Sequence, residues 1–188
     1  MQQETITMVV TKSEVEGEPI ISGTSITVAE ILNKLTEGWC LGDIMETYSF
    51  PTDKPILNAV AYTELLPFQH PLANKLKQYR EHLKQKVSAI LTELKQCFEV
   101  LYGEQLVQIV LFGSQARGDA NPGSDIDVLV VLKDPVDFEV ENSLPSKVLA
   151  ELSLRHTEVI NCIFMNDFDF QHSQEPLLRN IRQEGVFI

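Results

Sequence analysis

The stretch LFGSQARGDANPGSDIDVLVVL, residues 111–132, begins and ends with apolar residues that are typical of buried β-strands. The polar insert between these strands contains three glycines, two serines, one arginine and a final pair of aspartates separated by one residue. A turn that only joins two strands needs far fewer residues. The length and composition of the insert therefore predict that it forms a functional site.

The first half of the insert has groups that suit a bound phosphate. Gly113 and Ser114 directly follow the strand expected at 106–112. A glycine at a strand end lets a ligand come close to the backbone, and free backbone N–H groups beyond a strand bind anions. The Ser114 hydroxyl and the Arg117 guanidinium add further donors for phosphate oxygens. We therefore expect a phosphate-binding loop here.

The second half of the insert has groups that suit a metal ion. Asp125 and Asp127 stand where the strand expected at 126–132 begins, and their spacing puts both carboxylates on one face of that strand. Two carboxylates held so close repel each other unless a cation lies between them. Mg²⁺ is commonly bound by one or two carboxylates together with substrate phosphates. The pair therefore predicts a site for a divalent cation.

Each of these features also has an ordinary structural explanation. Solvated strand starts often carry acidic residues, Gly-Ser is common in turns, and Arg117 could form an ion pair with Asp119 or Asp134. Taken together, in this order and between two apolar strands, the features are much more specific for catalysis.

The rest of the second half of the chain reads as helices alternating with strands. Apolar residues at steps of three and four predict one long helix from Pro71 that ends near Gly103. Strands are expected at 106–112, 126–132, 136–140 and 157–165, and helices at 145–154 and 175–185. This order indicates an α/β (α+β) fold in which helices pack on a sheet.

Composition excludes several classes of function. The net charge of −12 argues against binding DNA or RNA, which depends on basic contacts to phosphates. No apolar run approaches the roughly 20 residues of a membrane span, and the N-terminus lacks the pattern of a signal peptide. Cys40, Cys97 and Cys162 are scattered and show no metal-ligand spacing. These features predict a cytoplasmic protein with reduced thiols.

The pattern of Gly-Ser, Ala-Arg-Gly and Ser-Asp-x-Asp before a hydrophobic strand resembles the signature of minimal nucleotidyltransferases of the DNA polymerase beta superfamily. The resemblance covers roughly residues 71–188. It implies a small mixed sheet with helices packed on one side. It also implies nucleotide contacts, with ATP as the expected substrate, from Gly113, Ser114, Arg117 and Ser124. Asp125 and Asp127 would then bind Mg²⁺, with two ions expected.

Members of this family usually have a third carboxylate on a later strand, and Glu158 is the residue we expect in that role. It stands near the start of the strand expected at 157–165, alternating with Ile160 and Cys162. In the implied reaction, two metal ions stabilise the attacking and leaving oxygens while a hydroxyl attacks the α-phosphate and pyrophosphate leaves. Glu158 would complete the metal site and help to deprotonate that hydroxyl. A solvated glutamate on an edge strand is the alternative.

The first part of the chain has a different composition. Residues 1–66 contain ten acidic residues, three lysines and no arginine. The run ETITMVVT, residues 4–11, predicts a strand, and Thr27 with Glu30 has the spacing of a capping box. Helices are expected at 28–38, 41–49 and 56–66. We therefore predict two domains, a three-helix module over 1–66 and a nucleotidyltransferase domain over 67–188.

Residues 17–50, GEPIISGTSITVAEILNKLTEGWCLGDIMETYSF, resemble a small antitoxin-like module, the domain-of-unknown-function family numbered 433. The resemblance implies a winged-helix-like or three-helix fold and a link to toxin–antitoxin systems. Such a fold would suggest DNA binding, but a module without arginine has poor groups for phosphate contacts. We expect it to contact a protein instead.

These features leave three functional hypotheses. The first is an enzyme that transfers AMP from ATP to a hydroxyl of a partner protein, which the resemblance implies to be a HEPN-type toxin neutralised by this chain. The second is a nucleotidyltransferase that modifies small molecules such as antibiotics. The third is a non-catalytic antitoxin that masks a toxin. The sequence leaves the oligomeric state open.

Overall fold

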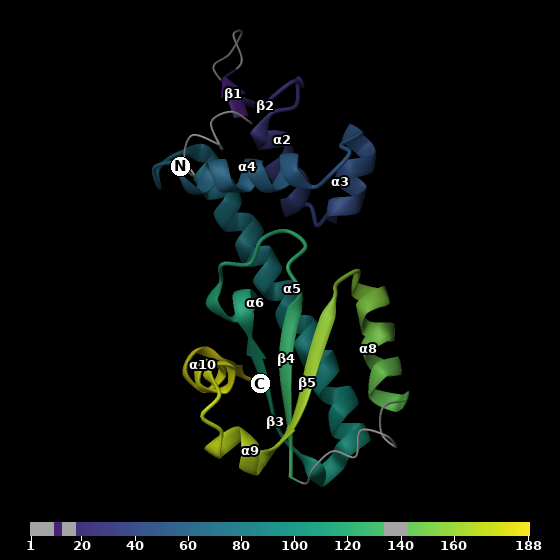
Figure 1. Cartoon of the computed structure of the whole chain (residues 1–188). Coiled ribbons are helices and arrows are strands. Elements are labelled where there is room, and N and C mark those ends of the chain that lie inside the picture. Colours follow the sequence, from purple (N-terminus) through teal and green to yellow (C-terminus); the bar gives the residue numbers. More distant parts are fainter. Residues whose placement is uncertain (1–9, 13–17, 134–142) are drawn as a thin grey trace. The chain divides into compact units, whose positions relative to one another are not determined.

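The structure, a computed structural model, describes residues 10–12, 18–133 and 143–188 of the chain (Figure 1). These residues form two compact units. The first contains the described residues up to Leu83 together with residues 121–123, and the second contains the described residues of 84–120 and 124–188. The division falls inside the long helix α5 (Pro71–Tyr102). The domain boundary after residue 66 stays a prediction.

The first unit is mainly helical. Its elements are β1 (Val10–Lys12), β2 (Pro19–Ile21), α2 (Val28–Thr36), α3 (Leu41–Tyr48) and α4 (Lys54–Glu64). Helix α2 begins with the predicted capping box, in which the Glu30 N–H donates to Thr27 Oγ1 at 3.1 Å and the Thr27 N–H donates to the Glu30 carboxylate at 2.7 Å. Apolar residues of α2, α3, α4 and the start of α5 form its core. The three predicted helices are confirmed.

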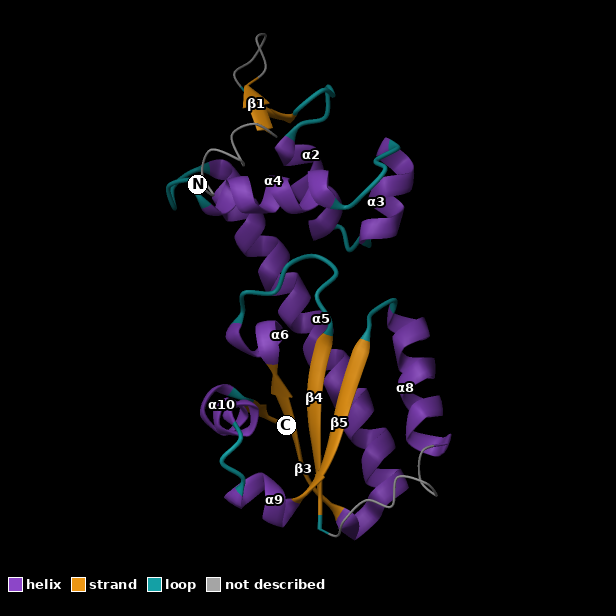
Figure 2. Ribbon diagram, viewed as in Figure 1, coloured by secondary structure: helices purple, strands orange, loops and turns teal. Residues whose placement is uncertain are grey.

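The second unit is built on a four-stranded mixed sheet (Figure 2). Its strands are β3 (Leu106–Phe112), β4 (Ile126–Leu132), β5 (Ile160–Asn166) and β6 (Val186–Phe187), in the order β5-β4-β3-β6. Strand β4 pairs antiparallel with β3 and parallel with β5, whereas β6 pairs antiparallel with β3. The small mixed sheet expected from the sequence is confirmed.

One face of this sheet packs against α5 and α8 (Ser143–His156). The ring of Phe164 on β5 lies 5.9 Å from the ring of Phe98 on α5. Helix α8 lies next to α5, because Arg155 and His156 both pair with Glu93 of α5. This face is the apolar layer that the periodicity of the long helix predicts.

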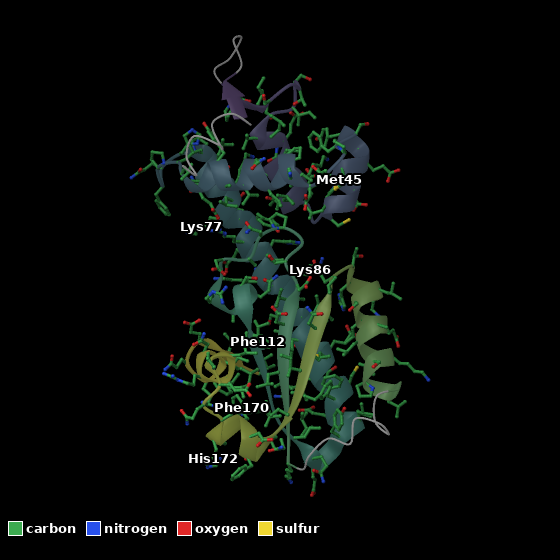
Figure 3. All side chains as sticks on the ribbon, viewed as in Figure 1. Met45, Lys77, Lys86, Phe112, Phe170 and His172 are labelled. Carbon is green, nitrogen blue, oxygen red and sulfur yellow. The ribbon has the colours of Figure 1, made fainter. Side chains whose placement is uncertain are left out.

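The other face is covered only in part, by α9 (Asp167–His172) and α10 (Pro176–Glu184). Phe170 and two residues of α10 pack on Val110, Leu129 and Val131 of the sheet. Figure 3 labels Phe112 and Phe170, which both lie on the side of the sheet that carries α10. We expected helices on one side of the sheet, and the structure corrects this detail, since helices pack on both faces.

Three elements were not expected: α6 (Gly113–Arg117), α9 and β6. The 3-10 turn Gly103–Gln105 ends α5 where the sequence predicts its end. Strand β5 begins at Ile160 and not at residue 157, because Thr157 has a φ of +55°, outside the extended region that a strand requires. The strand expected at 136–140, most of that at 4–11, and Asp134 lie outside the described residues.

Cys40, Cys97 and Cys162 are free thiols. Among the helices that the structure describes, none combines the length and the apolar character needed to cross a bilayer.

Gly185, which joins α10 to β6, is expected to be essential for stability. A Cβ atom there would lie 2.6 Å from Val110 Cγ1 and would also collide with the carbonyl oxygen of Ile181. Because that oxygen belongs to the helix backbone, Gly185→Ala is expected to lower the free energy of unfolding by about 1–3 kcal/mol. Denaturant unfolding followed by circular dichroism measures this change.

Gly42→Ala is the matched control. Its added Cβ atom would make an ordinary contact of 3.6 Å with Cys40 Sγ, and alanine inside a helix raises stability by about 0.5–1 kcal/mol. A Gly185→Ala variant as stable as the wild type would show that the contact with Ile181 relaxes at no cost.

Candidate active site

The two aspartates of the insert converge on one amide group. Asp125 directly precedes β4 and is exposed, and Asp127, the second residue of β4, is half-buried. Asn161 Nδ2 donates to Asp125 Oδ2 at 3.0 Å and to Asp127 Oδ1 at 3.3 Å. The two carboxylates therefore lie within hydrogen-bond reach of a single atom.

The pairing of β4 with β5 explains this convergence. Asp127 and Asn161 are register partners in the parallel pair, and neighbouring residues of paired strands point to the same face of a sheet. Phe112, the last residue of β3, is the partner of Asp127 on its other side. The face with Asp127 and Asn161 is the one that α9 and α10 cover in part.

Gly113 packs directly against the second aspartate. Its φ of +75° lies in the left-handed region, and a Cβ atom at this position would lie 2.7 Å from Asp127 Oδ2. Any side chain would strain the backbone and push into the carboxylate, so both the conformation and the close approach require glycine. Ser114 follows in α6 and is half-buried. The expected phosphate-binding residues and the expected metal ligands are therefore neighbours.

The two ends of the insert are tied to each other. Gln115 Nε2 donates to the backbone oxygen of Ser124 at 3.3 Å, and so links α6 to the residue before Asp125. The insert is thus a closed loop whose ends meet beside the aspartates. Contacts of Ser114 and Ser124 with a nucleotide stay predictions.

Arg117 forms the ion pair that we considered as its alternative. Its Nε lies 3.3 Å from Asp119 Oδ2, and the two side chains are 47% and 60% exposed. An ion pair this exposed contributes little to stability, so Arg117 can exchange Asp119 for another anion at small cost.

The structure does not bring Glu158 to the aspartates. Glu158 Oε1 lies 2.6 Å from Nζ of Lys86, which Figure 3 labels on α5, and the Glu158 N–H donates to the Ser153 oxygen at the end of α8. Within the described ranges, no group of three or more His, Cys, Asp and Glu side chains could hold a metal ion. As a third ligand, Glu158 stays a prediction that this geometry does not support.

Sequence reasoning missed Asn161, the residue that faces both aspartates from β5. The alternation of the strand contained the signal, because a strand that begins at Ile160 places Asn161 and Ile163 on one face and Cys162 on the other. Starting the strand at residue 157 drew attention to the glutamate and away from the asparagine.

The donor set at the aspartates fits a hard divalent cation. The carboxylates of Asp125 and Asp127 both reach Nδ2 of Asn161, and the same side chain carries an amide oxygen. Carboxylate and amide oxygens are ligands of the kind that Mg²⁺ accepts. Two protein carboxylates leave room for the phosphate oxygens that usually complete such a site.

Cys162, the next residue of β5, lies against β4. Its register partner is Val128, and burial raises the pKa of the Cys162 thiol to about 12. The thiol is therefore protonated at neutral pH, and thiolate chemistry is not supported.

Two family models match segments of the chain. The family model described as nucleotidyltransferase domain matches residues 76–187, and a second one, described as protein of unknown function (DUF433), matches residues 9–63. Both resemblances seen in the sequence are thereby confirmed.

Two proteins of Methanocaldococcus jannaschii, both named "Putative protein adenylyltransferase", are similar to part of the chain. One is 30% identical over 78 residues, which are 42% of this chain and 78% of that relative. The other is 38% identical over 85 residues, which are 45% of this chain and 79% of that relative.

A crystal structure described as a toxin–antitoxin with AMP-PNP is 18% identical, with a TM-score of 0.37, over 55% of this chain and 70% of that chain. A likeness of this size supports no conclusion about function. The match over residues 76–187 spans more than half of the chain and includes the loop and both aspartates. The chain therefore belongs to the nucleotidyltransferase domain family.

Proposed function

We propose that this chain transfers AMP from ATP to a hydroxyl group of a partner protein. The convergence of Asp125 and Asp127 beside Gly113 is the observation that carries the proposal. Two carboxylates that converge in this way suit a divalent cation, and the Gly113 backbone beside them is one that a phosphate can approach closely. The names of the two M. jannaschii relatives support a protein as the acceptor and an adenylyl group as the cargo.

In this proposal each residue of the loop has a defined task. Gly113 lets the triphosphate lie against the backbone, while Ser114 and Ser124 donate hydrogen bonds to it. Arg117 exchanges its ion pair with Asp119 for the phosphates. Asp125 and Asp127 would hold Mg²⁺, which supplies positive charge to the phosphate oxygens.

The reaction is a substitution at the α-phosphorus. The acceptor oxygen forms a bond to this phosphorus, and the bond from the phosphorus to the bridging oxygen breaks. Pyrophosphate leaves with the electron pair, and the hydroxyl proton is lost to solvent. The loop contributes mainly by position, because holding the reacting groups in line removes much of the entropic barrier.

We propose that the acceptor is a toxin of the HEPN type and that this chain is its antitoxin. The resemblance of residues 17–50 to an antitoxin-like module supports the pairing, and the match at 9–63 supports that resemblance. The acidic composition of the first 66 residues suits contact with a basic protein.

A second candidate function is masking of a toxin without catalysis. The observation that favours it is the neutral Asn161 facing the aspartates, while Glu158 is paired with Lys86. A site with two carboxylates in place of three is a weaker binder of cations.

Intact-mass spectrometry tests the proposal directly. This chain is incubated with ATP, Mg²⁺ and the protein encoded next to it, with an Asp125→Asn, Asp127→Asn double variant as control. We expect the partner to gain one or more AMP units only with the wild type, because the variant lacks both anionic ligands. A tight complex without any mass gain would favour masking. No binding and no gain would favour a small-molecule acceptor.

Variants of Glu158 and Asn161 separate the two possible partners of the aspartates. Because Glu158 pairs with Lys86, Glu158→Gln is expected to leave the rate of AMP transfer within about threefold of the wild type. Asn161→Ala is expected to lower the rate by about tenfold or more, since it removes the group that orients both carboxylates. The reverse ranking in a single-turnover assay would restore Glu158 as the third ligand.

Gly113 and Gly118 form a matched pair for testing the close approach. Their φ values are +75° and +78°, so alanine at either position is expected to cost about 1–2 kcal/mol of stability. Only at Gly113 would the new Cβ atom meet the Asp127 carboxylate, whereas at Gly118 nothing lies within 4 Å. We expect only Gly113→Ala to weaken Mn²⁺-dependent ATP binding, by about tenfold or more, in isothermal titration calorimetry. Equal weakening by both variants would assign the effect to backbone strain.

A further inference from the structure

A hollow with a volume of about 190 Å³ lies between α6 and α10. It is lined on one side by Phe112, Gly113 and Ala116 and on the other by Leu177 and Ile181. Gly113 is shared with the site at the aspartates, because it lines the hollow and also packs against Asp127. A ligand that lies over the Gly113 backbone can therefore reach both the carboxylates and the hollow.

The hollow has apolar walls and a polar rim. Phe112, Leu177 and Ile181 supply apolar surface, and Arg117, Asn180 and Glu184 supply polar groups. Leu177, Asn180 and Glu184 follow one another at helical steps of three and four, so they form one stripe along α10. In the part of the chain that the structure describes, Asn180 and Glu184 make no side-chain hydrogen bond or ion pair, so both remain available to a ligand.

The charges of the hollow do not suit a phosphate group. Glu184 adds a carboxylate to the lining, and Arg117, the only cation among the lining residues, is the one proposed above to bind the triphosphate beside Gly113. Phosphate oxygens at this position would be repelled by Glu184. A flat, neutral group with apolar faces and hydrogen-bonding edges fits better, because its faces can pack on Phe112 and Leu177.

We propose that the hollow between α6 and α10 holds the base of the nucleoside triphosphate and selects a purine that carries an amino group, as adenine does. The Glu184 carboxylate accepts from the exocyclic amine, and the Asn180 amide donates to a ring nitrogen. A base such as uracil presents a carbonyl oxygen in place of the amine, and a carboxylate repels it. The inference rests on the proposed function, since it assigns the base to a triphosphate bound at Gly113.

Calorimetric titration of the full chain with ATP, UTP and inorganic tripolyphosphate, each with Mg²⁺, tests the inference. The variant is an Asn180→Ala, Glu184→Ala double substitution on the exposed side of α10, where alanine favours the helix. Gln183→Ala, also exposed on α10 but outside the hollow, is the matched control. We expect the double variant to bind ATP about tenfold more weakly, to lose the preference for ATP over UTP and to bind tripolyphosphate unchanged.

Two results would overturn the base site. Equal weakening of ATP and tripolyphosphate would assign the hollow to phosphates, and unchanged binding of all three ligands would show that the nucleotide does not enter it. These results are distinct from a failure of the proposed function. The wild-type chain could bind ATP more tightly than tripolyphosphate and UTP and yet modify no protein. That result would support the base site and contradict protein adenylylation.

Discussion

The backbone of Gly113 passes so close to the Asp127 carboxylate that no side chain fits between them. This contact follows from the antiparallel register of β3 and β4, in which Phe112 is the partner of Asp127. The chain must leave β3 beside the second aspartate, and the left-handed conformation of Gly113 turns it into α6 at that point. The groups suited to phosphate and those suited to a cation are therefore brought together by the register of one pair of strands.

Strand β5 decides the charge of the site. Its parallel register with β4 places a neutral amide, Asn161, next to Asp127, and the left-handed Thr157 keeps Glu158 out of the strand. The Glu158 carboxylate is compensated by Lys86, whereas the two aspartates have only amide hydrogen bonds in the described structure. Uncompensated like charges at short distance favour the binding of a cation, and a bound cation would supply the positive charge that the protein does not.

Much of this arrangement could be predicted because its signals are local. The apolar runs that form β3 and β4, the glycine and serine between them and the spacing of Asp125 and Asp127 lie within one continuous stretch. The capping box at Thr27 and the end of the long helix near Gly103 are local signals too. Where a few neighbouring residues set the conformation, sequence reasoning was accurate.

The features that sequence reasoning did not predict depend on pairing between distant segments of the chain. Whether Glu158 or Asn161 faces the aspartates depends on the register of β5 against β4, and one residue of shift in that register exchanges the two faces of the strand. Helices on both faces of the sheet were missed for a related reason. Strand β6 has two residues, too few to show a periodic pattern, and the approach of α10 to the sheet depends on the bare backbone at Gly185.

Helix α5 has a consequence for how the two family segments can be inherited. Leu72 and Tyr79 are buried with the core of the first unit, whereas Ile90 and Phe98 are buried further along the same helix in the second. Recombination that exchanges one whole unit between related proteins must therefore join the two sequences inside a helix and not in a loop. The shared helix thus constrains the joint evolution of both segments.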